Sequence, residues 1–402
     1  MARWIPALSL LFLACTEAKP KGALDATPTL PERPAPTKPA EGSGDPNLTS
    51  VKSDAQRAID LLSAWVKPGA ADPTVPWAMT HGLVGFGPGL TTSDGRSVVD
   101  YLVVEYSERT NIAGKPRTTF PPRTFANEPL EPHENIILKT LVEVGVPMDH
   151  EFSMKDGPKV TLDALIDEIA PVITVPVDEG EWRQAAWTVS LLLQAREPTF
   201  RIGADANKPA TVKDLGLAAI FQLESQQRFL EDLMAAGHPE KVEKKKQGIF
   251  GHPCGGMHLI QAAVLAAAKL GDPALVARAQ RQLDVMLFRY SAEKAIYEDA
   301  FRRAPEYALV LKIQELKFYG HMLETLALAA KWGVLPVTPE LRASAMELTR
   351  QVVLTVAQLE PAYKDLDTIR RKQKQSYLDL IGDGCHAIRG LREVLQVVFG
   401  TP

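Results

Sequence analysis

Residues 251–271 read GHPCGGMHLIQAAVLAAAKLG, and this stretch decides how the whole chain is interpreted. From Cys254 onward, apolar residues recur at three- and four-residue spacing, which is typical of a helix with one buried face. Gly271 follows the last of them, where a glycine suits a helix end because it adopts the left-handed conformation without strain. A similar ending, LAAKWG at 328–333, places Gly333 after a second apolar segment. The chain is therefore expected to repeat a helical unit.

The repeat is marked by evenly spaced glycines, each followed within two residues by a histidine: Gly256 and His258, Gly320 and His321, Gly384 and His386. Helical periodicity predicts helices over 254–270, 273–290, 306–332, 339–359 and 384–399. Long alternating, strand-like runs are lacking in the sequence. The nearest candidate, PVITVPV at 171–177, contains prolines that favour a loop or an edge segment.

A period of about sixty residues with two helices per unit predicts helical hairpins stacked side by side, and the domain has room for about six of them. Six hairpins can close into a ring in which one helix of each hairpin lines the inside. Small residues such as the repeated glycines relieve crowding between such inner helices. The arrangement resembles the (α/α) toroid of glycosidases, polysaccharide lyases, terpenoid cyclases and lanthionine synthetase cyclases. An open HEAT-like solenoid is the structural alternative.

Composition supports an all-α domain with a substantial core. Of 402 residues, 45% are apolar and 23% are charged, and Leu, Ala, Lys, Glu and Arg dominate the second half. The formal net charge of −4 is small for this length, and no basic patch or stripe is present. Because nucleic-acid-binding domains concentrate Lys and Arg on one face, no nucleic-acid partner is expected.

The first fifty residues differ from the rest. Residues 1–14 combine one positive charge with a short apolar run, as in a secretory signal. FLAC at 12–15 resembles a bacterial lipobox, which implies lipidation of Cys15. The proline-rich segment 15–50 is then a disordered tether to a domain over 51–402. We expect an exported protein, lipid-anchored to a bacterial membrane on its periplasmic or outer surface; an ordinary signal cleaved a few residues later is the alternative.

Apart from Cys15, Cys254 and Cys385 are the only cysteines. Each is expected in the first turn of a helix, with Asp383 as the cap of the second, so that the helix dipole lowers the thiol pKa. Cys254 also precedes His258 by four residues, the spacing that places two side chains on one helix face. Three interpretations stay open: a disulfide in an oxidising compartment, a metal site, and two unpaired core thiols.

Short motifs resemble those of lanthionine synthetase cyclases, whose zinc is held by two cysteines and a histidine. PCGG at 253–256 and CHAIRG at 385–390 occur in the order of the family's zinc motifs, and WAMTHGLVGFG at 77–87 resembles its His-Gly segment. The resemblance implies zinc ligation by Cys254, Cys385 and His386, and a catalytic acid–base role for His81.

Other residues are expected to line a cleft at the mouth of the ring. The glycine-rich stretch GFGPGLTTSDG at 85–95 suits a mobile loop there. The residues expected around it are Trp77, Asp94, Asp100 and Tyr101, with a rim of His81, His133, His258, His321 and His386. Histidine is suited to acid–base catalysis near neutral pH, and we assign that role to His81 and His258.

Two functions from different classes follow. The first is an exported toroid lipoprotein whose cleft binds a ligand, as a hydrolase, lyase or zinc enzyme acting on a glycan or peptide. The second is a non-catalytic surface module that binds another protein and is stapled by a Cys254–Cys385 disulfide.

Overall fold

The structure is a computed structural model that describes residues 46–401 except 113–114, 156 and 204–209. The predicted signal segment, Cys15 and residues 15–45 of the predicted tether lie outside the described residues. Helix α1 (Pro46–Ala70) begins before residue 51, so residues 46–50, which we assigned to the tether, belong to the first helix.

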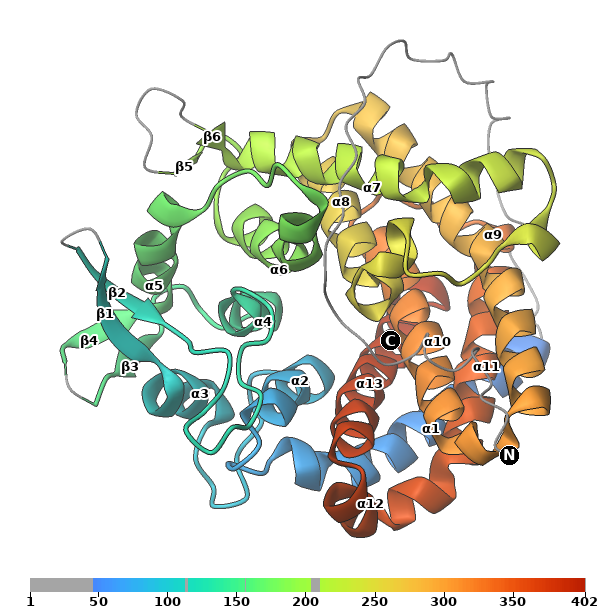
Figure 1. The fold of residues 1–402 in the computed structure, drawn as a ribbon, viewed down its shortest axis with the longest axis horizontal. Helices are drawn as coiled ribbons and strands as arrows, with labels where there is room; N and C mark the ends of the chain where they lie inside the picture. Colours follow the sequence, from blue (N-terminus) through green and yellow to red (C-terminus); the bar gives the residue numbers. More distant parts are fainter. Residues whose placement is uncertain (1–45, 113–114, 156, 204–209, 402) are drawn as a thin grey trace, which may run out of the picture.

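The described part of the chain is predominantly helical, as expected for an all-α protein (Figure 1). The α-helices are α1, α2 (Pro76–Phe86), α3 (Val98–Tyr106), α4 (Ile136–Glu143), α5 (Leu162–Ile169), α6 (Glu179–Ala195), α7 (Val212–Ala235), α8 (Met257–Leu270), α9 (Pro273–Arg303), α10 (Ala308–Lys331), α11 (Pro339–Lys364), α12 (Leu366–Lys372) and α13 (Lys374–Glu393). Among these residues no helix has the length and apolar character that a membrane span requires.

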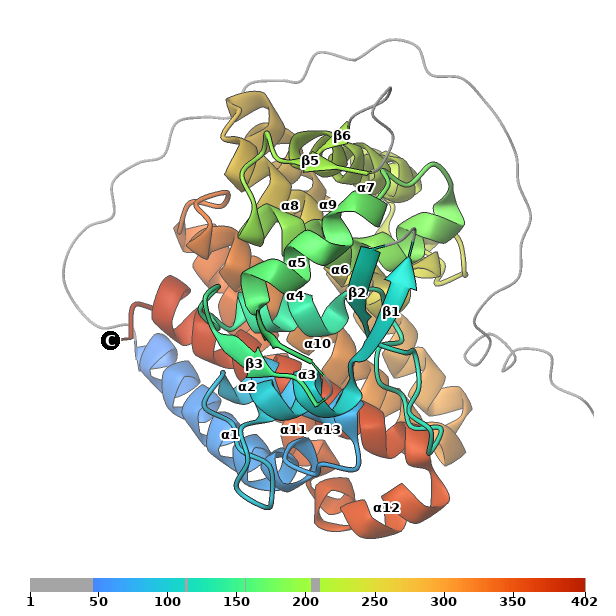
Figure 2. The same cartoon turned by 90° about the vertical axis from the view of Figure 1, so that its left-hand side faces the viewer.

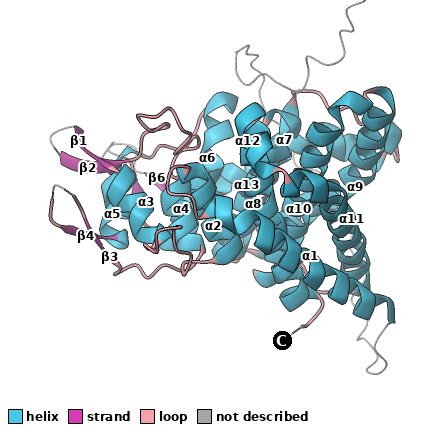
Figure 3. Ribbon diagram, turned by 90° about the horizontal axis from the view of Figure 1, so that it is seen from below, coloured by secondary structure: helices cyan, strands magenta, loops and turns pink. Residues whose placement is uncertain are grey.

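Three antiparallel two-stranded ribbons interrupt the helices. They are β1 (Glu108–Ile112) with β2 (Lys115–Thr119), β3 (Glu151–Ser153) with β4 (Lys159–Thr161), and β5 (Arg201–Ile202) with β6 (Ala210–Thr211). Each ribbon lies in a connection between two helices. Figure 3 shows β1–β4 at one side of a helical body, and in Figure 2 this side, with β1, β2 and β3, faces the viewer. Residues 171–177 form a 3₁₀ turn and a loop rather than a strand, as their prolines indicated.

Six helices pack in succession. Helix α2 packs against α4, α4 against α6, α6 against α8, α8 against α10 and α10 against α13, and α13 packs in turn against α2. In Figure 1, α3, α5, α7, α9 and α11 lie farther from the middle of the molecule than these six. Helices closer to the middle therefore alternate along the chain with helices farther out, which agrees with a hairpin repeat.

Glycines permit the closest of these contacts. A Cβ on Gly390 of α13 would lie 3.0 Å from the backbone nitrogen of Glu324 and 3.0 Å from the carbonyl oxygen of Gly320, both on α10. A Cβ on Gly85 of α2 would lie 3.1 Å from Cα of Cys385 on α13. Contacts this short leave no room for a side chain, so α13 approaches both of its neighbours backbone to backbone.

The predicted start of the last helix was wrong. Helix α13 begins at Lys374, so Asp383 lies inside it and does not cap it, and Cys385 lies in its middle. Buried Tyr377, Leu380 and Ile381 extend the apolar face toward the N-terminus. Gly384, which suggested a helix start, packs in mid-helix, where a Cβ would lie 2.8 Å from Cγ1 of Val66 on α1.

Candidate functional site

Side chains from α2, α4, α6, α8, α10 and α13 enclose a small cavity of about 50 Å³, which we call the central pocket. It is lined by Trp77, Thr80, His81, Val84, His133, Ile136, Lys139, Thr140, Trp187, Cys254, His258, Lys317, His321, Asp379, Asp383 and His386. His258, His321, His386 and Asp383 are buried, whereas Trp77, His81, His133, Cys254, Lys317 and Asp379 are partly exposed. Polar groups from distant parts of the chain thus converge on one hollow.

The structure brings together seven of the residues that the sequence singled out. Trp77 and His81 come from α2, His133 precedes α4, Cys254 and His258 lie at the start of α8, and His321 and His386 lie near the middle of α10 and α13. His321 lies inside its helix, as the predicted helix over 306–332 indicated, whereas His386 was expected near the start of a helix over 384–399 and instead lies in the middle of α13.

Three other residues expected at the cleft do not line the pocket. Asp94 is exposed and forms an ion pair with Arg96, and the guanidinium of Arg96 lies 4.2 Å from the ring centre of Tyr101. Asp100 accepts a hydrogen bond from Nε2 of His150 over 2.8 Å. The 85–95 segment folds back on itself, with a bridge between Thr91 and Ser97, and holds these groups away from the middle of the molecule.

Cys254 is presented by a turn with unusual backbone geometry. Cys254, Gly255 and Gly256 have φ values of 52°, 61° and 79°, so three consecutive residues are left-handed before α8 begins at Met257. Such a conformation is strained for a residue with a side chain, and strain of this kind is concentrated at functional sites. The turn replaces the first helical turn expected from the sequence and directs the thiol into the pocket.

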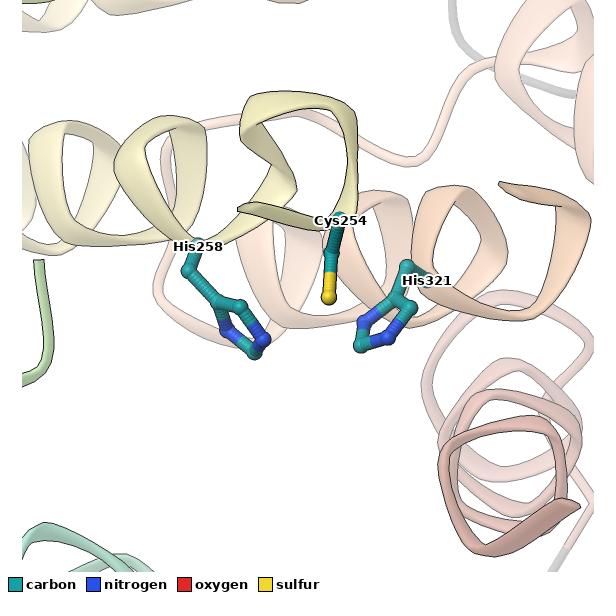
Figure 4. Close-up of side chains that lie close together, drawn as sticks. All are labelled: Cys254, His258 and His321. Atoms are coloured by element: carbon teal, nitrogen blue, oxygen red, sulfur yellow. The ribbon is translucent and has the colours of Figure 1, made fainter. Parts of the chain in front are cut away.

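The sulfur of Cys254 lies between the rings of His258 and His321 (Figure 4). One ligand atom from each of these residues lies within 4.8 Å of the other two. The ring centres of His258 and His321 are 5.0 Å apart. One thiol and two imidazoles in a cluster of this size form a ligand set suited to zinc.

Cys385 does not belong to this group. It is fully buried in α13, its sulfur lies 3.3 Å from the position of a Cβ on Gly85, and among the described residues neither Cys254 nor Cys385 forms a disulfide. Burial raises its pKa, the opposite of the predicted lowering. Because successive helical residues point about 100° apart, Cys385 faces α2 while His386 faces the pocket. The structure therefore disagrees with two predictions. These are the zinc site of Cys254, Cys385 and His386, and the alternative Cys254–Cys385 disulfide.

The two histidines beside Cys254 carry opposite pKa shifts. Burial, followed by the charges of His321 and His386, holds the pKa of His258 well below its usual value. Burial would also lower the pKa of His321, but Cys254 and Glu324 raise it to about 10. At neutral pH His258 is therefore an uncharged imidazole, whereas His321 holds a proton that a metal ion would have to displace.

A buried network supports the floor of the pocket. Nδ1 of His386 donates to Oε2 of Glu324 over 2.8 Å, and the same oxygen lies 3.6 Å from Nδ1 of His321. Arg389 lies 3.3 Å from Glu324 and 2.8 Å from Glu143, which also pairs with Lys139 at 2.5 Å. His321, Glu324 and His386 form a second cluster of ligand type. The adjacent Arg389 charge opposes a cation there, so we interpret this cluster as support for His321.

A second polar group forms the wall next to Cys254. Nζ of Lys317 lies 3.4 Å from Asp379 and 3.6 Å from Asp383, and Asp383 approaches Nε2 of His321 to 3.9 Å. Burial raises the pKa of Asp383 to about 7. Two buried atoms here, Nδ1 of His321 and Oδ2 of Asp383, have no hydrogen-bond partner. Unsatisfied buried polar atoms are rare and point to a group that completes the site.

Sequence analysis missed Lys317 and Asp383 as residues that line the pocket, and Glu324 as the acid that supports its floor. A signal was present: Lys317 precedes His321 by four residues, and Glu324 follows it by three, the spacings of one helix face. The same spacings connect Asp379, Asp383 and His386. No protein-family model, curated protein or solved structure matches this chain, so the pocket is interpreted from its own geometry.

Proposed function

We propose that the protein is an exported, lipid-anchored (α/α) toroid whose central pocket binds one divalent transition-metal ion through Cys254, His258 and His321 and acts as a metal-dependent hydrolase. The carrying observation is the cluster of one thiol and two imidazoles whose ligand atoms lie within 4.8 Å of one another. Export and anchoring rest on the signal-like and lipobox-like residues 1–15.

The order of helix packing supports the toroid over the open solenoid. In an open stack, the first and last hairpins are separated by the whole array. In this chain α13 packs against α2 as well as α10, and α1 packs against both α11 and α13. Gly85 and Gly390 provide the backbone contacts on the two sides of α13. Joining of the first and last hairpins is what a closed ring of six hairpins requires.

The ligand chemistry favours zinc. Zinc is bound by Cys at about 2.3 Å and by His at about 2.0–2.1 Å, and catalytic zinc sites combine three protein ligands with an open fourth position. The soft thiolate and the imidazoles are poor ligands for magnesium or calcium. Here three side chains face a cavity, so a fourth position is available to water or substrate.

A zinc ion in this position would lower the pKa of a bound water and polarise a substrate oxygen, which is the chemistry of hydrolysis. The residues of the chain prepare that site. His258 stays neutral through burial, Glu324 lies beside Nδ1 of His321, and Asp383 lies next to the other ring nitrogen. Asp383 is positioned to exchange a proton inside the pocket, since its pKa lies near 7.

The test is metal binding by the purified full chain. Competition titration with a chromophoric chelator is expected to give one equivalent of Zn²⁺. Replacement by Co²⁺ is expected to give a thiolate charge-transfer band. Cys254→Ser should abolish the band, and His258→Ala should weaken Zn²⁺ binding by more than about 100-fold, since even residues outside the ligand set contribute 10–100-fold.

Cys385→Ala is the matched control, because Cys385 is the other described cysteine and faces α2. It should keep both the stoichiometry and the cobalt band. Loss of the band in Cys385→Ala with retention in Cys254→Ser would contradict the assignment, as would a wild-type protein that binds no Zn²⁺.

A further inference from the structure

Three histidines of the central pocket share one arrangement of their ring nitrogens. Nδ1 of His81 lies 2.8 Å from the carbonyl oxygen of Trp77, Nδ1 of His386 lies 2.8 Å from Glu324, and Nδ1 of His133 lies 2.8 Å from Oε1 of Gln184. Each partner atom is an acceptor, so each Nδ1 carries the proton and donates it. The nitrogen left for the cavity is Nε2, which in this tautomer is a hydrogen-bond acceptor.

The rings are held firmly in this orientation. His81 packs on Trp77 with ring centres 3.9 Å apart, and His133 lies parallel to Trp187 at 3.8 Å with an interplanar angle of 3°. Burial also holds the pKa values of His81 and His133 below their usual range. These two histidines therefore remain uncharged acceptors at neutral pH.

The charged groups of the pocket already pair with one another. Arg389 lies 3.3 Å from Glu324, and Lys317 lies 3.4 Å from Asp379 and 3.6 Å from Asp383. Each of these carboxylates lies within 3.6 Å of a cationic side chain, which weakens its attraction for an organic cation, and an anionic ligand would meet acceptors at His81 and His133. A neutral ligand rich in hydroxyl groups suits the pocket better, because each hydroxyl donates to an imidazole and also accepts a hydrogen bond.

We infer that the pocket recognises a neutral glycan through its hydroxyl groups, with Nε2 of His81, His133 and His386 as acceptors and the partly exposed ring of Trp77 as an apolar platform. The cavity of about 50 Å³ exceeds the roughly 10–15 Å³ of cavity volume that one water molecule requires. It therefore admits the hydroxylated edge of a sugar at the end or side of a chain. The inference takes the pocket of the proposed function as the binding site, but it does not depend on the metal ion.

The experiment measures binding of neutral trisaccharides, namely N,N′,N″-triacetylchitotriose, cellotriose and maltotriose, by isothermal titration calorimetry, with metal-loaded and metal-free full chain. N-acetyl-trialanine amide is the peptide arm of the same experiment. At least one trisaccharide should bind, and His81→Phe and His133→Phe should each weaken it by about fivefold or more, the effect of one lost hydrogen bond. Phenylalanine keeps the ring that stacks on each tryptophan.

His238→Phe is the control, because His238 is exposed and pairs with Glu240 outside the pocket. It should bind like the wild type. If one of the two pocket variants fails to fold, the sugar affinity of the other one is the test. A second measurement is the melting temperature of the wild type, which a bound sugar should raise.

The outcomes separate the two proposals. Sugar binding by protein that takes up no Zn²⁺ supports the glycan site and refutes the metal site, whereas Zn²⁺ binding with no trisaccharide bound refutes the glycan site alone. Binding of the peptide amide in place of the sugars, or unchanged sugar affinity in both Phe variants, also overturns the inference.

Discussion

His386 and Glu324 join two neighbouring helices at the floor of the central pocket: Nδ1 of His386 on α13 donates to Oε2 of Glu324 on α10 over 2.8 Å. The same carboxylate lies 3.6 Å from Nδ1 of His321 and 3.3 Å from Arg389. One buried acid therefore orients two imidazoles while Arg389 compensates its charge. Burial raises the pKa of Glu324, but the interactions with His386 and Arg389 hold it well below the usual value.

Replacement of Glu324 should weaken metal binding. In Glu324→Gln the negative charge beside His321 is lost, and we expect Zn²⁺ affinity to fall by about 10–100-fold, the usual effect of removing an outer partner of a ligating histidine. Competition titration measures it. Glu347→Gln, which removes a carboxylate that pairs with Tyr290 and Lys294 outside the pocket, should leave the affinity unchanged. Equal Zn²⁺ affinities in Glu324→Gln and Glu347→Gln would contradict the role of Glu324 as a support for His321.

Metal should protect Cys254 from alkylation. Cys254 is partly exposed and Cys385 is fully buried, so of these two described cysteines iodoacetamide should modify Cys254 and spare Cys385 in the folded, metal-free chain. Saturating Zn²⁺ should slow that reaction, because the metal would occupy the thiolate. Peptide mass mapping identifies the modified cysteine. Modification at an unchanged rate in the presence of Zn²⁺ would argue that the sulfur is not a ligand.

Backbone contact between α10 and α13 should make Gly390 intolerant of substitution. A Cβ there would lie 3.0 Å from two backbone atoms of α10, so Gly390→Ala should reduce the free energy of unfolding by about 1–3 kcal/mol, as overpacking does. Urea denaturation measures the change. Gly89→Ala is the control, since no atom lies within 4 Å of its Cβ position. A Gly390→Ala chain as stable as wild type would show that the two helices are farther apart.

Glu131 should make stability depend on pH. Burial, with the charge of Glu134, raises its pKa from 4.5 to about 8, so the folded chain binds this proton more tightly than the unfolded chain. The protonated carboxyl of Glu131 stabilises the folded chain fully below about pH 4.5, and this stabilisation is lost as the pH rises toward 8. Each unit of difference between the folded and unfolded pKa contributes about 1.4 kcal/mol to the free energy of unfolding.

Glu131→Gln removes that dependence while leaving an oxygen to accept from the backbone N–H of Ile137. The free energy of unfolding of the wild type minus that of the variant should therefore fall between pH 4.5 and 8, as chemical denaturation at several pH values would measure. A difference that stays constant, or that rises with pH, would contradict the buried, protonated state of Glu131.

Sequence reasoning anticipated the helical repeat and named His81, His133, His258, His321 and His386, which the structure places in one pocket. Helical periodicity is a local property, and apolar residues at three- and four-residue spacing are enough to reveal it. A histidine near the start or middle of such helices faces inward when its helix does. These inferences needed no knowledge of which helices are neighbours.

The errors arose where a local pattern has two physical causes. Gly384 suggested a helix start, but it lies inside α13. A glycine is required at this position because α1 packs closely against it. That error displaced Asp383 and put Cys385 in a first turn. The adjacent cysteine and histidine at 385–386 matched a zinc motif, yet consecutive helical residues face different neighbours. Asp94 and Tyr101 interact with Arg96, and Asp100 pairs with His150, which is distant in sequence; no spacing in the sequence reveals that these contacts keep the three residues out of the pocket.

X-ray absorption at the zinc edge of the metal-loaded full chain tests the ligand set most directly. The proposed site predicts one sulfur at about 2.3 Å and two imidazole nitrogens at about 2.0–2.1 Å, with the remaining position filled by a light atom from solvent. Two sulfurs would mean that Cys385 also binds the metal. No sulfur would remove Cys254 from the site, and either result would contradict a pocket centred on Cys254, His258 and His321.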